Sequence, residues 1–309
     1  MNSILRIREK ARAADKLILL PEYDDKRTQE AAAMINSEGI ARAVLLTPDK
    51  IDPVKKEKYA EQFFQMRKAK GMTQEEARGI FEDPLYYAAM ETKAGAADGF
   101  VAGAVHTTPD MVRASILCLG VDKHIGLACS CFIMDVPDCE YGQNGLFIYA
   151  DCGVIPDPDA AQVASIALAA SELGSRILDM PPRVALLSYS TKGSAKGKSV
   201  EKMVEALKIL RSKAPQLEAD GELQVDAAIV PEVARIKSPG NPMAGKANIL
   251  IFPDLSAGNI SYKLTQRLAK ARALGPILLG LSKPCSDLSR GCSAEDIVDC
   301  SAVTAVRAE

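Results

Sequence analysis

The stretch Gly275–Val298, GPILLGLSKPCSDLSRGCSAEDIV, contains a strand, a turn and a helix start in direct succession. The apolar run over 275–281 is typical of a buried strand, and the helix is expected to begin at Ser293. In open α/β sheets, ligands bind at the carboxyl ends of the strands. We therefore expect an α/β fold with a ligand site in the loop between this strand and this helix.

This loop brings several reactive side chains together. Within eight positions it supplies a hydroxyl, a guanidinium, a thiol and a carboxylate, from Ser289, Arg290, Cys292 and Asp296. A hydroxyl, an arginine and an acid together suit chemistry on an anionic substrate. Position alone favours a simpler role for Asp296, because Ser293-Ala-Glu-Asp296 matches a capping box in which Asp296 is only a helix-start acid.

The rest of the chain alternates short apolar runs with amphipathic segments. Helices are expected at residues 3–14, 25–37, 57–70, 73–79, 84–94, 108–119, 157–173, 199–212 and 256–273, and strands at 16–20, 42–46, 97–102, 124–136, 145–150, 183–188, 247–252 and 275–281. Such alternation is typical of a mostly parallel sheet with helices on both faces. The apolar segment 298–308 is expected to pack back on the first part of the chain, and no change in composition marks a domain boundary.

Composition and charge exclude several classes of protein. The chain has 309 residues, 48% hydrophobic and 25% charged, with a formal net charge of −2. Such a balance gives no basic surface for nucleic acid or an anionic membrane. No apolar run reaches the ~18 residues of a membrane span, and the charged N-terminal segment does not resemble a signal peptide. We therefore expect a cytoplasmic protein without nucleic-acid or membrane partners.

Eight cysteines and two histidines offer little for a metal site. Zinc sites use Cys and His pairs at short spacing, and the sequence contains no CxxC pair; Cys129 and Cys131 come nearest. A cytosolic chain of this size rarely carries a disulfide framework. We expect reduced cysteines that act mostly as small core residues, and no bound metal.

Two further segments have the composition of ligand-binding loops. Ser190–Ser199, STKGSAKGKS, has three residues where the nucleotide-binding loop needs four, so it is either an anion-binding helix start or a solvated basic loop. Asp98–Gly103 lacks the dinucleotide fingerprint GxGxxG. His106, which follows it, is more often a hydrogen-bonded structural residue than a catalytic base.

Two arginines are candidates for binding an anion. Arg67 lies at a basic helix end, and Arg113 lies one turn into the helix after Thr108. A guanidinium binds phosphate in a two-pronged geometry that lysine cannot copy. From the sequence pattern alone, each is better explained as part of a solvated helix face.

Long, ordered segments of the chain resemble the phosphate acetyltransferase (phosphotransacetylase) family over nearly the whole length. The matching segments are LLPEYDDKRTQEAA, RKAKGMT, ADGFVAGAVHTTPDMVRA, VPDCEYG, LLSYSTKGSAKGKSVEK, DGELQVDAAIVPEVA, GKANILIFPDLSAGNISYKLTQRLAKA and GPILLGLSKPCSDLSRGCSAEDIV. The resemblance implies reversible transfer of an acetyl group between acetyl phosphate and coenzyme A, giving acetyl-CoA and phosphate. Coenzyme A would be a substrate, with no tightly bound cofactor.

The resemblance also implies an architecture. Each chain of a homodimer would form two three-layer αβα domains with an interdomain cleft, as in isocitrate and isopropylmalate dehydrogenases. Domain I would comprise residues 1–123 and 279–309 and carry the catalytic loop. Domain II, residues 124–278, would supply the dimer contact and one wall of the cleft.

Five residues of this sequence match functional residues of the family. The catalytic serine, arginine and aspartate fall on Ser289, Arg290 and Asp296, and two substrate-binding arginines fall on Arg67 and Arg113. The implied mechanism is direct attack of the coenzyme A thiolate in a ternary complex, with Asp296 as the general base. Ser289 would donate to the carbonyl oxygen, and Arg290 with Arg67 or Arg113 would hold the phosphate.

Three alternatives remain open at this point. Cys292 could form an acetyl-enzyme, although no histidine lies near it in the sequence. The acyl group could be propionyl or butyryl, since one methylene changes binding by only ~1–3 kcal/mol. The chain could instead be a noncatalytic acetyl-CoA-sensing module, which the intact Ser289, Arg290 and Asp296 argue against.

Overall fold

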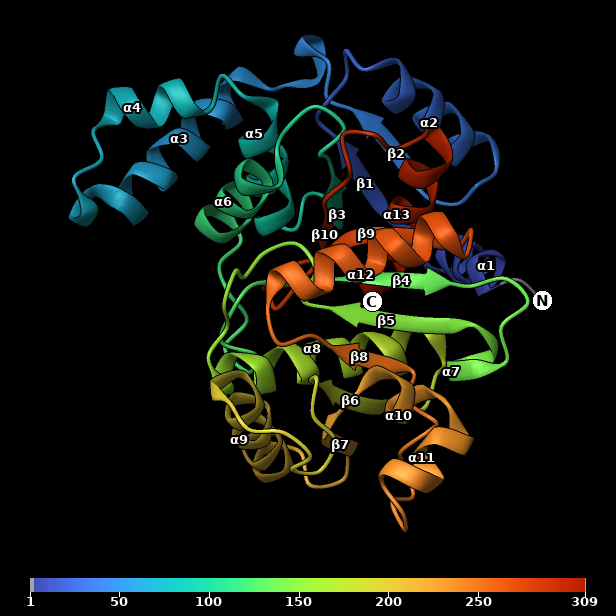
Figure 1. Cartoon of the computed structure of the whole chain (residues 1–309). Helices are drawn as coiled ribbons and strands as arrows, with labels where there is room; N and C mark the ends of the chain where they lie inside the picture. The colour runs from blue at the N-terminus through green and yellow to red at the C-terminus, as the bar shows by residue number, and fades with distance from the viewer. Residues whose placement is uncertain (1–2, 309) are drawn as a thin grey trace. The chain divides into compact units, whose positions relative to one another are not determined.

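The computed structural model describes residues 3–308, which form two compact units. The first unit is built from both ends of the chain, Met1–Val121 and Leu281–Glu309, and the second is the continuous segment Asp122–Gly280. Each unit has its own strands and helices (Figure 1). Both are α/β, as the alternation of apolar and amphipathic segments predicts.

Parallel strands in the order β2-β1-β3-β10 form the sheet of the first unit. These strands are β1 (Leu17–Leu20), β2 (Arg42–Leu45), β3 (Gly99–Val101) and β10 (Cys285–Ser286). The first three confirm strands expected from their apolar runs. β10 was not expected, because a strand of two residues leaves no periodic pattern in the sequence.

Several helices of the first unit begin at residues that cap them. Asp52 and Asp83 accept hydrogen bonds from the first N–H groups of α3 (Pro53–Arg67) and α5 (Pro84–Lys93). Both helices start with proline. The N–H of the first helical residue has no acceptor within the helix, so proline, which has no N–H, loses no hydrogen bond at this position. The unit also contains α1 (Ser3–Ala14), α2 (Lys26–Ser37), α4 (Gln74–Ile80), α6 (Thr108–Cys118), α13 (Ala294–Arg307) and the short 3-10 turns η1 (Pro48–Lys50) and η2 (Lys68–Lys70).

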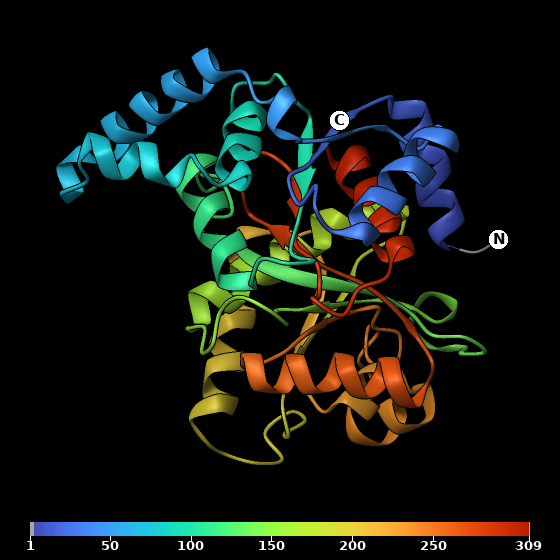
Figure 2. The same cartoon turned by 90° about the horizontal axis from the view of Figure 1, so that it is seen from above.

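Helix α13 forms the buried centre of the first unit. It lies beside α1 and α2 in both views (Figures 1 and 2), and its residues Ile297–Val306 are all buried. Arg8 of α1 donates to Asp299 at 2.7 Å and to Glu295 at 2.5 Å. Burial opposes the charge of Arg8, yet these two carboxylates raise its pKa above the ordinary value. The C-terminal segment therefore packs on the start of the chain, as expected.

The strands of the second unit lie in the order β9-β4-β5-β8-β6-β7. β4 (Cys129–Asp135) is antiparallel to both β5 (Leu146–Ala150) and β9 (Arg272–Leu279). β5 pairs in parallel with β8 (Ile249–Ile251), which is followed by β6 (Arg183–Leu187) and β7 (Glu218–Leu223), also in parallel. The pairing is otherwise parallel, as expected. The short connection from β4 to β5 permits a hairpin but no crossover, so this pair is antiparallel.

Alternate residues of these strands face helices on opposite sides of the sheet. Phe132 stacks on Tyr262 of α12 (Leu255–Leu268), with ring centroids 3.9 Å apart. On the other side, Gly174 of α8 (Ala160–Leu178) leaves room for Ile148 and Ile249. The unit also contains α7 (Tyr141–Asn144), α9 (Lys198–Lys213), α10 (Val225–Ile229) and α11 (Pro231–Lys237).

Some expected boundaries in the second unit are wrong. The strand expected over 124–136 begins only at Cys129, because Asp122 accepts from the N–H groups of His124 and Ile125 and forms a turn there. The helix expected over 256–273 ends at Leu268, since β9 has begun by Arg272. β7 was missed because its sequence, EADGEL, is mostly polar and acidic.

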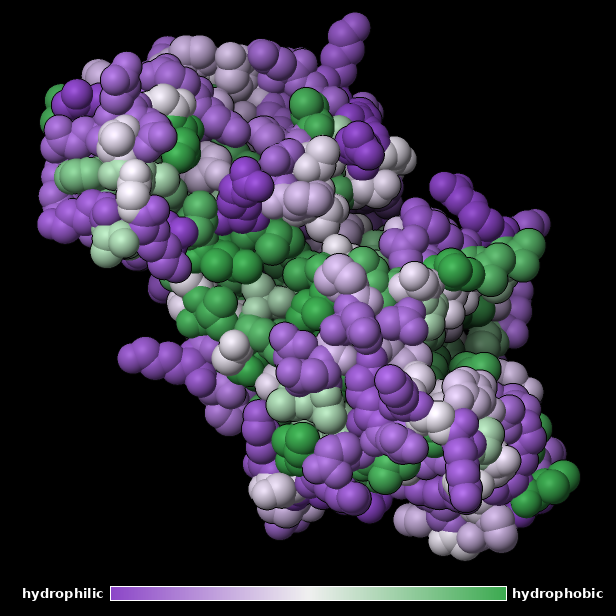
Figure 3. All heavy atoms as spheres, turned by 60° about the vertical axis from the view of Figure 1, so that its left-hand side comes forward, coloured by the Kyte–Doolittle hydropathy of each residue, from purple (hydrophilic) through white to green (hydrophobic). Residues whose placement is uncertain are grey.

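Hydrophilic side chains predominate on the face of the molecule in Figure 3, with hydrophobic ones between them. None of the helices formed by residues 3–308 is both long enough and apolar enough to cross a membrane.

Candidate active site

The loop with the predicted catalytic residues joins β10 to α13 in the first unit. β10 ends at Ser286 and pairs with β3, and α13 begins at Ala294. The loop therefore leaves the carboxyl end of a parallel strand, where ligands bind in α/β folds. The sequence pattern predicted that the loop follows the strand at 275–281. This apolar run lies mostly in β9, and the strand that directly precedes the loop is β10.

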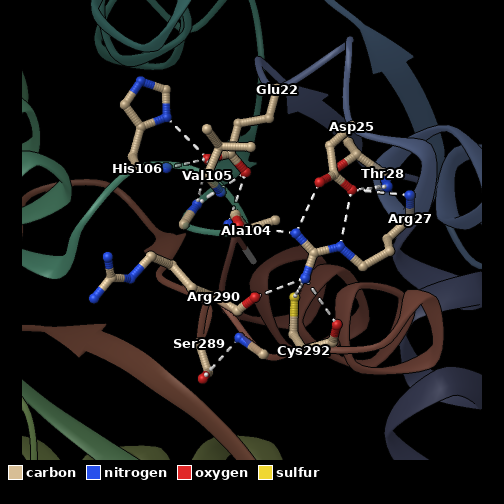
Figure 4. A network of polar contacts seen from close by, with 12 residues as sticks. Glu22, Asp25, Arg27, Thr28, Ala104, Val105, His106, Ser289, Arg290 and Cys292 are labelled. Atoms are coloured by element: carbon tan, nitrogen blue, oxygen red, sulfur yellow. Dashed lines mark hydrogen bonds and ion pairs between the residues drawn. The ribbon is translucent and has the colours of Figure 1, made fainter.

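Ser289 and Arg290 occupy a tight turn with their side chains exposed. The carbonyl of Ser289 accepts from the N–H of Cys292 at 2.9 Å, and the Ser289 hydroxyl accepts from the N–H of Gly291 at 3.3 Å. The Arg290 guanidinium projects away from the main-chain contacts of the loop (Figure 4). The turn thus fixes the backbone and leaves a hydroxyl and a guanidinium accessible to a ligand.

Asp296 caps α13, as its position in the sequence predicts. Its Oδ2 accepts from the N–H of Ser293 at 2.8 Å and from the Ser293 hydroxyl at 2.9 Å, and the Ser293 hydroxyl accepts from the N–H of Asp296. The side chain is half-buried. Oδ1 accepts no hydrogen bond from residues 3–308, so this oxygen can accept a proton or a hydrogen bond from a ligand.

Arg27 holds the loop from outside (Figure 4). Its Nη1 donates to the carbonyls of Arg290 at 2.8 Å and Cys292 at 3.1 Å, and its Nη2 donates to the carbonyl of Ala104 at 2.9 Å. Asp25 orients the guanidinium through bonds of 3.0 Å to Nε and 2.7 Å to Nη2, which lower the pKa of Asp25. Sequence reasoning missed Arg27; its one signal was the charged run DDKR at residues 24–27, in the loop and helix start that follow β1.

A buried carboxylate organises the neighbouring loop. Glu22 accepts from the N–H groups of residues 103–106 at 2.8–3.1 Å and from Nδ1 of His106 at 2.8 Å. His106 also bonds Asp83 at 3.2 Å. His106 is thus a hydrogen-bonded structural residue, as expected. The hydrogen bonds with Asp83 and Glu22 raise its pKa to about 10, which does not suit a general base.

The environment of Cys292 does not favour a nucleophile. The residue is 8% exposed, and burial raises the pKa of its thiol to about 11 although Arg27 opposes this shift. The thiolate, which is the reactive form, is therefore scarce at neutral pH. The described cysteines are all buried except Cys139, as expected for small core residues.

Arg113 and Arg67 lie on other helices of the first unit. Arg113 is exposed on α6, whose first residue, Thr108, bonds Asp287 of the loop at 2.6 Å. Arg67 ends α3, which lies farther from α13 than α6 does (Figures 1 and 2). Within residues 3–308, no hydrogen bond or ion pair joins either arginine to residues 287–293.

A cavity of about 580 Å³ lies beside Glu22 and His106 in the first unit, and Lys56 also lines it. Its other charged lining residues are acidic: Asp24, Asp25, Glu82 and Asp83. This lining does not suit a phosphate group.

The glycine-rich loop of the second unit is closed by a protein carboxylate. Glu222 accepts from the N–H of Gly193 at 2.7 Å and from the Ser190 hydroxyl at 2.9 Å. These donors are therefore not free for an anion. Among the described residues, no group of three or more His, Cys, Asp or Glu side chains could hold a metal ion.

Comparison with known proteins gives a consistent result. A family described as phosphate acetyl/butaryl transferase matches residues 3–305. The phosphate acetyltransferase of Acetivibrio thermocellus is 50% identical, with 100% of this chain and 99% of that protein aligned. The phosphate acetyltransferase of Clostridium acetobutylicum is 44% identical, with 100% and 99% aligned.

Solved structures agree with this result. A phosphotransacetylase from Streptococcus pyogenes superposes with a TM-score of 0.90 at 39% identity, covering 98% of this chain and 96% of that one. A putative 4-hydroxythreonine-4-phosphate dehydrogenase from Salmonella typhimurium has a TM-score of 0.54 at 12% identity, covering 96% and 99%. The second likeness is one of fold alone.

Proposed function

The chain belongs to the phosphate acetyl/butaryl transferase family, and on this premise we propose that it transfers an acetyl group reversibly between acetyl phosphate and coenzyme A. The observation that carries the proposal is the turn at Ser289 and Arg290. Its backbone is held by Arg27, while its hydroxyl and guanidinium are exposed. Such a pair suits a substrate with a carbonyl next to a phosphate.

The reaction needs no covalent enzyme intermediate. The sulfur of coenzyme A attacks the carbonyl carbon of acetyl phosphate, the C–S bond forms, and the C–O bond to phosphate breaks. The thiol proton passes to Asp296 through its available Oδ1, and phosphate leaves with the bonding electron pair. A thiol with a pKa near ~8.5 is mostly protonated at neutral pH, so a base within reach accelerates the attack.

The loop supplies two other parts of the mechanism. The Ser289 hydroxyl donates to the carbonyl oxygen as negative charge develops on it, an effect worth a few kcal/mol in comparable sites. The Arg290 guanidinium neutralises the departing phosphate in a two-pronged contact. The raised pKa of Cys292 supports direct transfer over an acetyl-enzyme on that residue.

Arg67 and Arg113 are proposed to bind the phosphate groups of the substrates. Arg113 is exposed, and Arg67 is half-buried at a basic helix end, where Lys68 and Lys70 follow it. These cations attract anions, and a guanidinium adds geometric selectivity for phosphate. Coenzyme A thus acts as a substrate, and no tightly bound cofactor is needed for this chemistry.

We place the first unit in the role of domain I and the second in that of domain II of a homodimer. Support for a dimer contact on the second unit comes from α12, where Ile260, Leu264 and Leu268 are exposed at intervals of four residues. This spacing puts them on one helix face, and exposed apolar faces mark interaction sites. Coenzyme A and acetyl phosphate are metabolites of the cytoplasm, where we expect the enzyme to act.

The test is an assay of coenzyme A acylation by acetyl, propionyl and butyryl phosphates, with comparison of kcat/KM. Acetyl phosphate is expected to be preferred, and activity with none of the three contradicts the proposal. Ser289→Ala and Arg290→Ala should lower kcat by on the order of 100-fold or more. Lys283→Ala, an exposed cation of the same segment, is the matched control and should keep wild-type rates.

A further inference from the structure

Asp287 is a fully buried acid that the reaction described above does not use. It lies between β10 and Ser289, with 0% of its surface exposed. Its Oδ2 accepts from the Thr108 hydroxyl at 2.6 Å. Its Oδ1 has no hydrogen-bond partner of normal geometry among the described residues.

The chain approaches this acid closely on one side. Gly103 has φ +113°, and a Cβ there would collide with Oδ1 of Asp287 and lie 2.6 Å from the N–H nitrogen of Leu288. The N–H of Gly103 in turn donates to Glu22. Two carboxylates therefore lie beside one glycine, and both are buried, Asp287 completely.

This packing favours a neutral Asp287. Burial raises the pKa of Asp287 to about 7, and Glu22 adds to the rise, although Thr108, the Leu288 N–H and His106 oppose it. The other titratable groups facing Asp287 keep one charge state near neutral pH. The pKa of Glu22 is lowered by His106 and the loop N–H groups despite its burial, that of His106 is about 10, and that of Cys285 is about 11 because it is buried.

We propose that Asp287 is a positioning residue that, through Thr108, fixes the loop bearing Ser289 and Arg290 against the start of α6, which bears Arg113. The proposal rests on the proposed function. While Asp287 is protonated, its hydrogen bond with the Thr108 hydroxyl is stable without further donors to the carboxyl group. Once Asp287 ionises, Oδ1 becomes a buried charge beside Glu22 with no hydrogen-bond donor in normal geometry, and the loop must open to hydrate it. Opening displaces Ser289 and Arg290 from the positions that transfer requires.

The first experiment compares Thr108→Val with Thr108→Ser. The valine variant should lower kcat on the order of 10- to 100-fold, because small displacements of reacting groups are costly, and serine should restore wild-type rates. Thr107→Ala is the matched control: Thr107 caps the same helix but bonds Asp110, not Asp287. Equal kinetic losses in Thr107→Ala and Thr108→Val would overturn the proposal.

The second experiment compares the pH profile of kcat in wild type and in Asp287→Asn. Asparagine keeps an acceptor for Thr108 and cannot ionise. Wild type should lose activity as the pH rises through about 7. The variant should lack this loss, and identical profiles would contradict the proposal.

A third measurement needs no activity, so it separates failure of this proposal from failure of the proposed function. The pKa of Asp287 is raised from 3.8 to about 7, so the folded state binds more protons than the unfolded state between these values. The contribution of Asp287 to wild-type stability therefore falls over this range as the pH rises. The urea midpoint of wild type relative to Asp287→Asn should decrease between pH 3.8 and about 7, and a constant difference would overturn the proposal. Absence of acyl transfer by wild type would reject the function and leave this outcome intact.

Discussion

Arg27 donates through Nη1 to the main-chain carbonyl of Arg290 at 2.8 Å, across 263 residues of sequence. One arginine thus sets the backbone from which another projects toward solvent. Because Arg27 also bonds the carbonyls of Cys292 and Ala104, it ties the loop after β10 to the loop after β3.

Replacing Arg27 should therefore lower turnover more than stability. In Arg27→Ala, kcat for acetyl transfer is expected to fall on the order of 10- to 100-fold, because Ser289 and Arg290 lose their fixed positions. Arg27→Lys should recover little, since an ammonium cannot bond three carbonyls from one plane. Arg12→Ala, an exposed arginine of α1, is the control. Wild-type kcat in Arg27→Ala would refute this role.

The ion pair between Arg8 and Asp299 predicts a large loss of stability. Arg8→Ala removes a cationic partner from a carboxylate that is 0% exposed, and breaking such a buried pair costs about 3 kcal/mol or more. Urea unfolding should show this loss, and Arg12→Ala should change the free energy of unfolding by less than about 1 kcal/mol. A small effect in both variants would show that Arg8 is dispensable.

His106 should make stability depend on alkaline pH. Its pKa is raised from 6.5 to about 10, so its stabilising effect is complete below 6.5 and is lost as the pH rises through about 10. The advantage of wild type over His106→Gln, measured by urea unfolding, should shrink across this range by a few kcal/mol at most. A difference independent of pH would exclude a protonated His106.

Gly103 should not tolerate a side chain. In Gly103→Ala, the strain of a positive φ adds to a collision with Asp287, so stability should fall by several kcal/mol. Gly39 has φ +65° and nothing within 4 Å of a Cβ, so Gly39→Ala isolates the strain, about 1–2 kcal/mol. If the two variants unfold at the same urea concentration, the collision of the new Cβ with Asp287 adds nothing to the loss of stability in Gly103→Ala.

Cys292 should be dispensable for transfer. With its thiol pKa near 11, alkylation by iodoacetamide at pH 8 should be slow in the folded protein, and Cys292→Ala should keep kcat within about threefold. Loss of turnover in Cys292→Ala with full activity in Asp296→Asn would instead indicate an acetyl-enzyme.

Local signals in the sequence were enough to predict many of the elements and part of the site. The capping box at Ser293 and the proline start of α5 are short-range patterns, so they predicted helix starts that the structure confirms. The helix expected over 57–70 is wrong at both ends, because α3 begins at Pro53, where Asp52 caps it, and ends at Arg67. The hydroxyl and guanidinium of the loop were likewise adjacent in the chain. The roles carried over from the family for these residues remain predictions.

Long-range contacts could not be predicted from those signals. Glu22 bonds residues 81–84 positions away, and Arg27 bonds residues more than 260 positions away. Nothing in the short run PEYDDKR distinguishes a hub of hydrogen bonds from a solvated helix start. β10 was missed for a related reason, because its two residues become a strand only by pairing with Phe100 and Val101.

The first unit is built from two segments of the chain, and the ribosome makes the whole second unit between them. The second unit, Asp122–Gly280, is complete before the ribosome reaches β10 and α13. Until then, β3 has β1 on one side but lacks β10 on the other, and Arg8 lacks Asp299. A nascent chain therefore carries an unfinished first unit while the second unit is synthesised, with apolar surface exposed to chaperones and proteases. The loop with Ser289 and Arg290 can form only after the second unit has been synthesised.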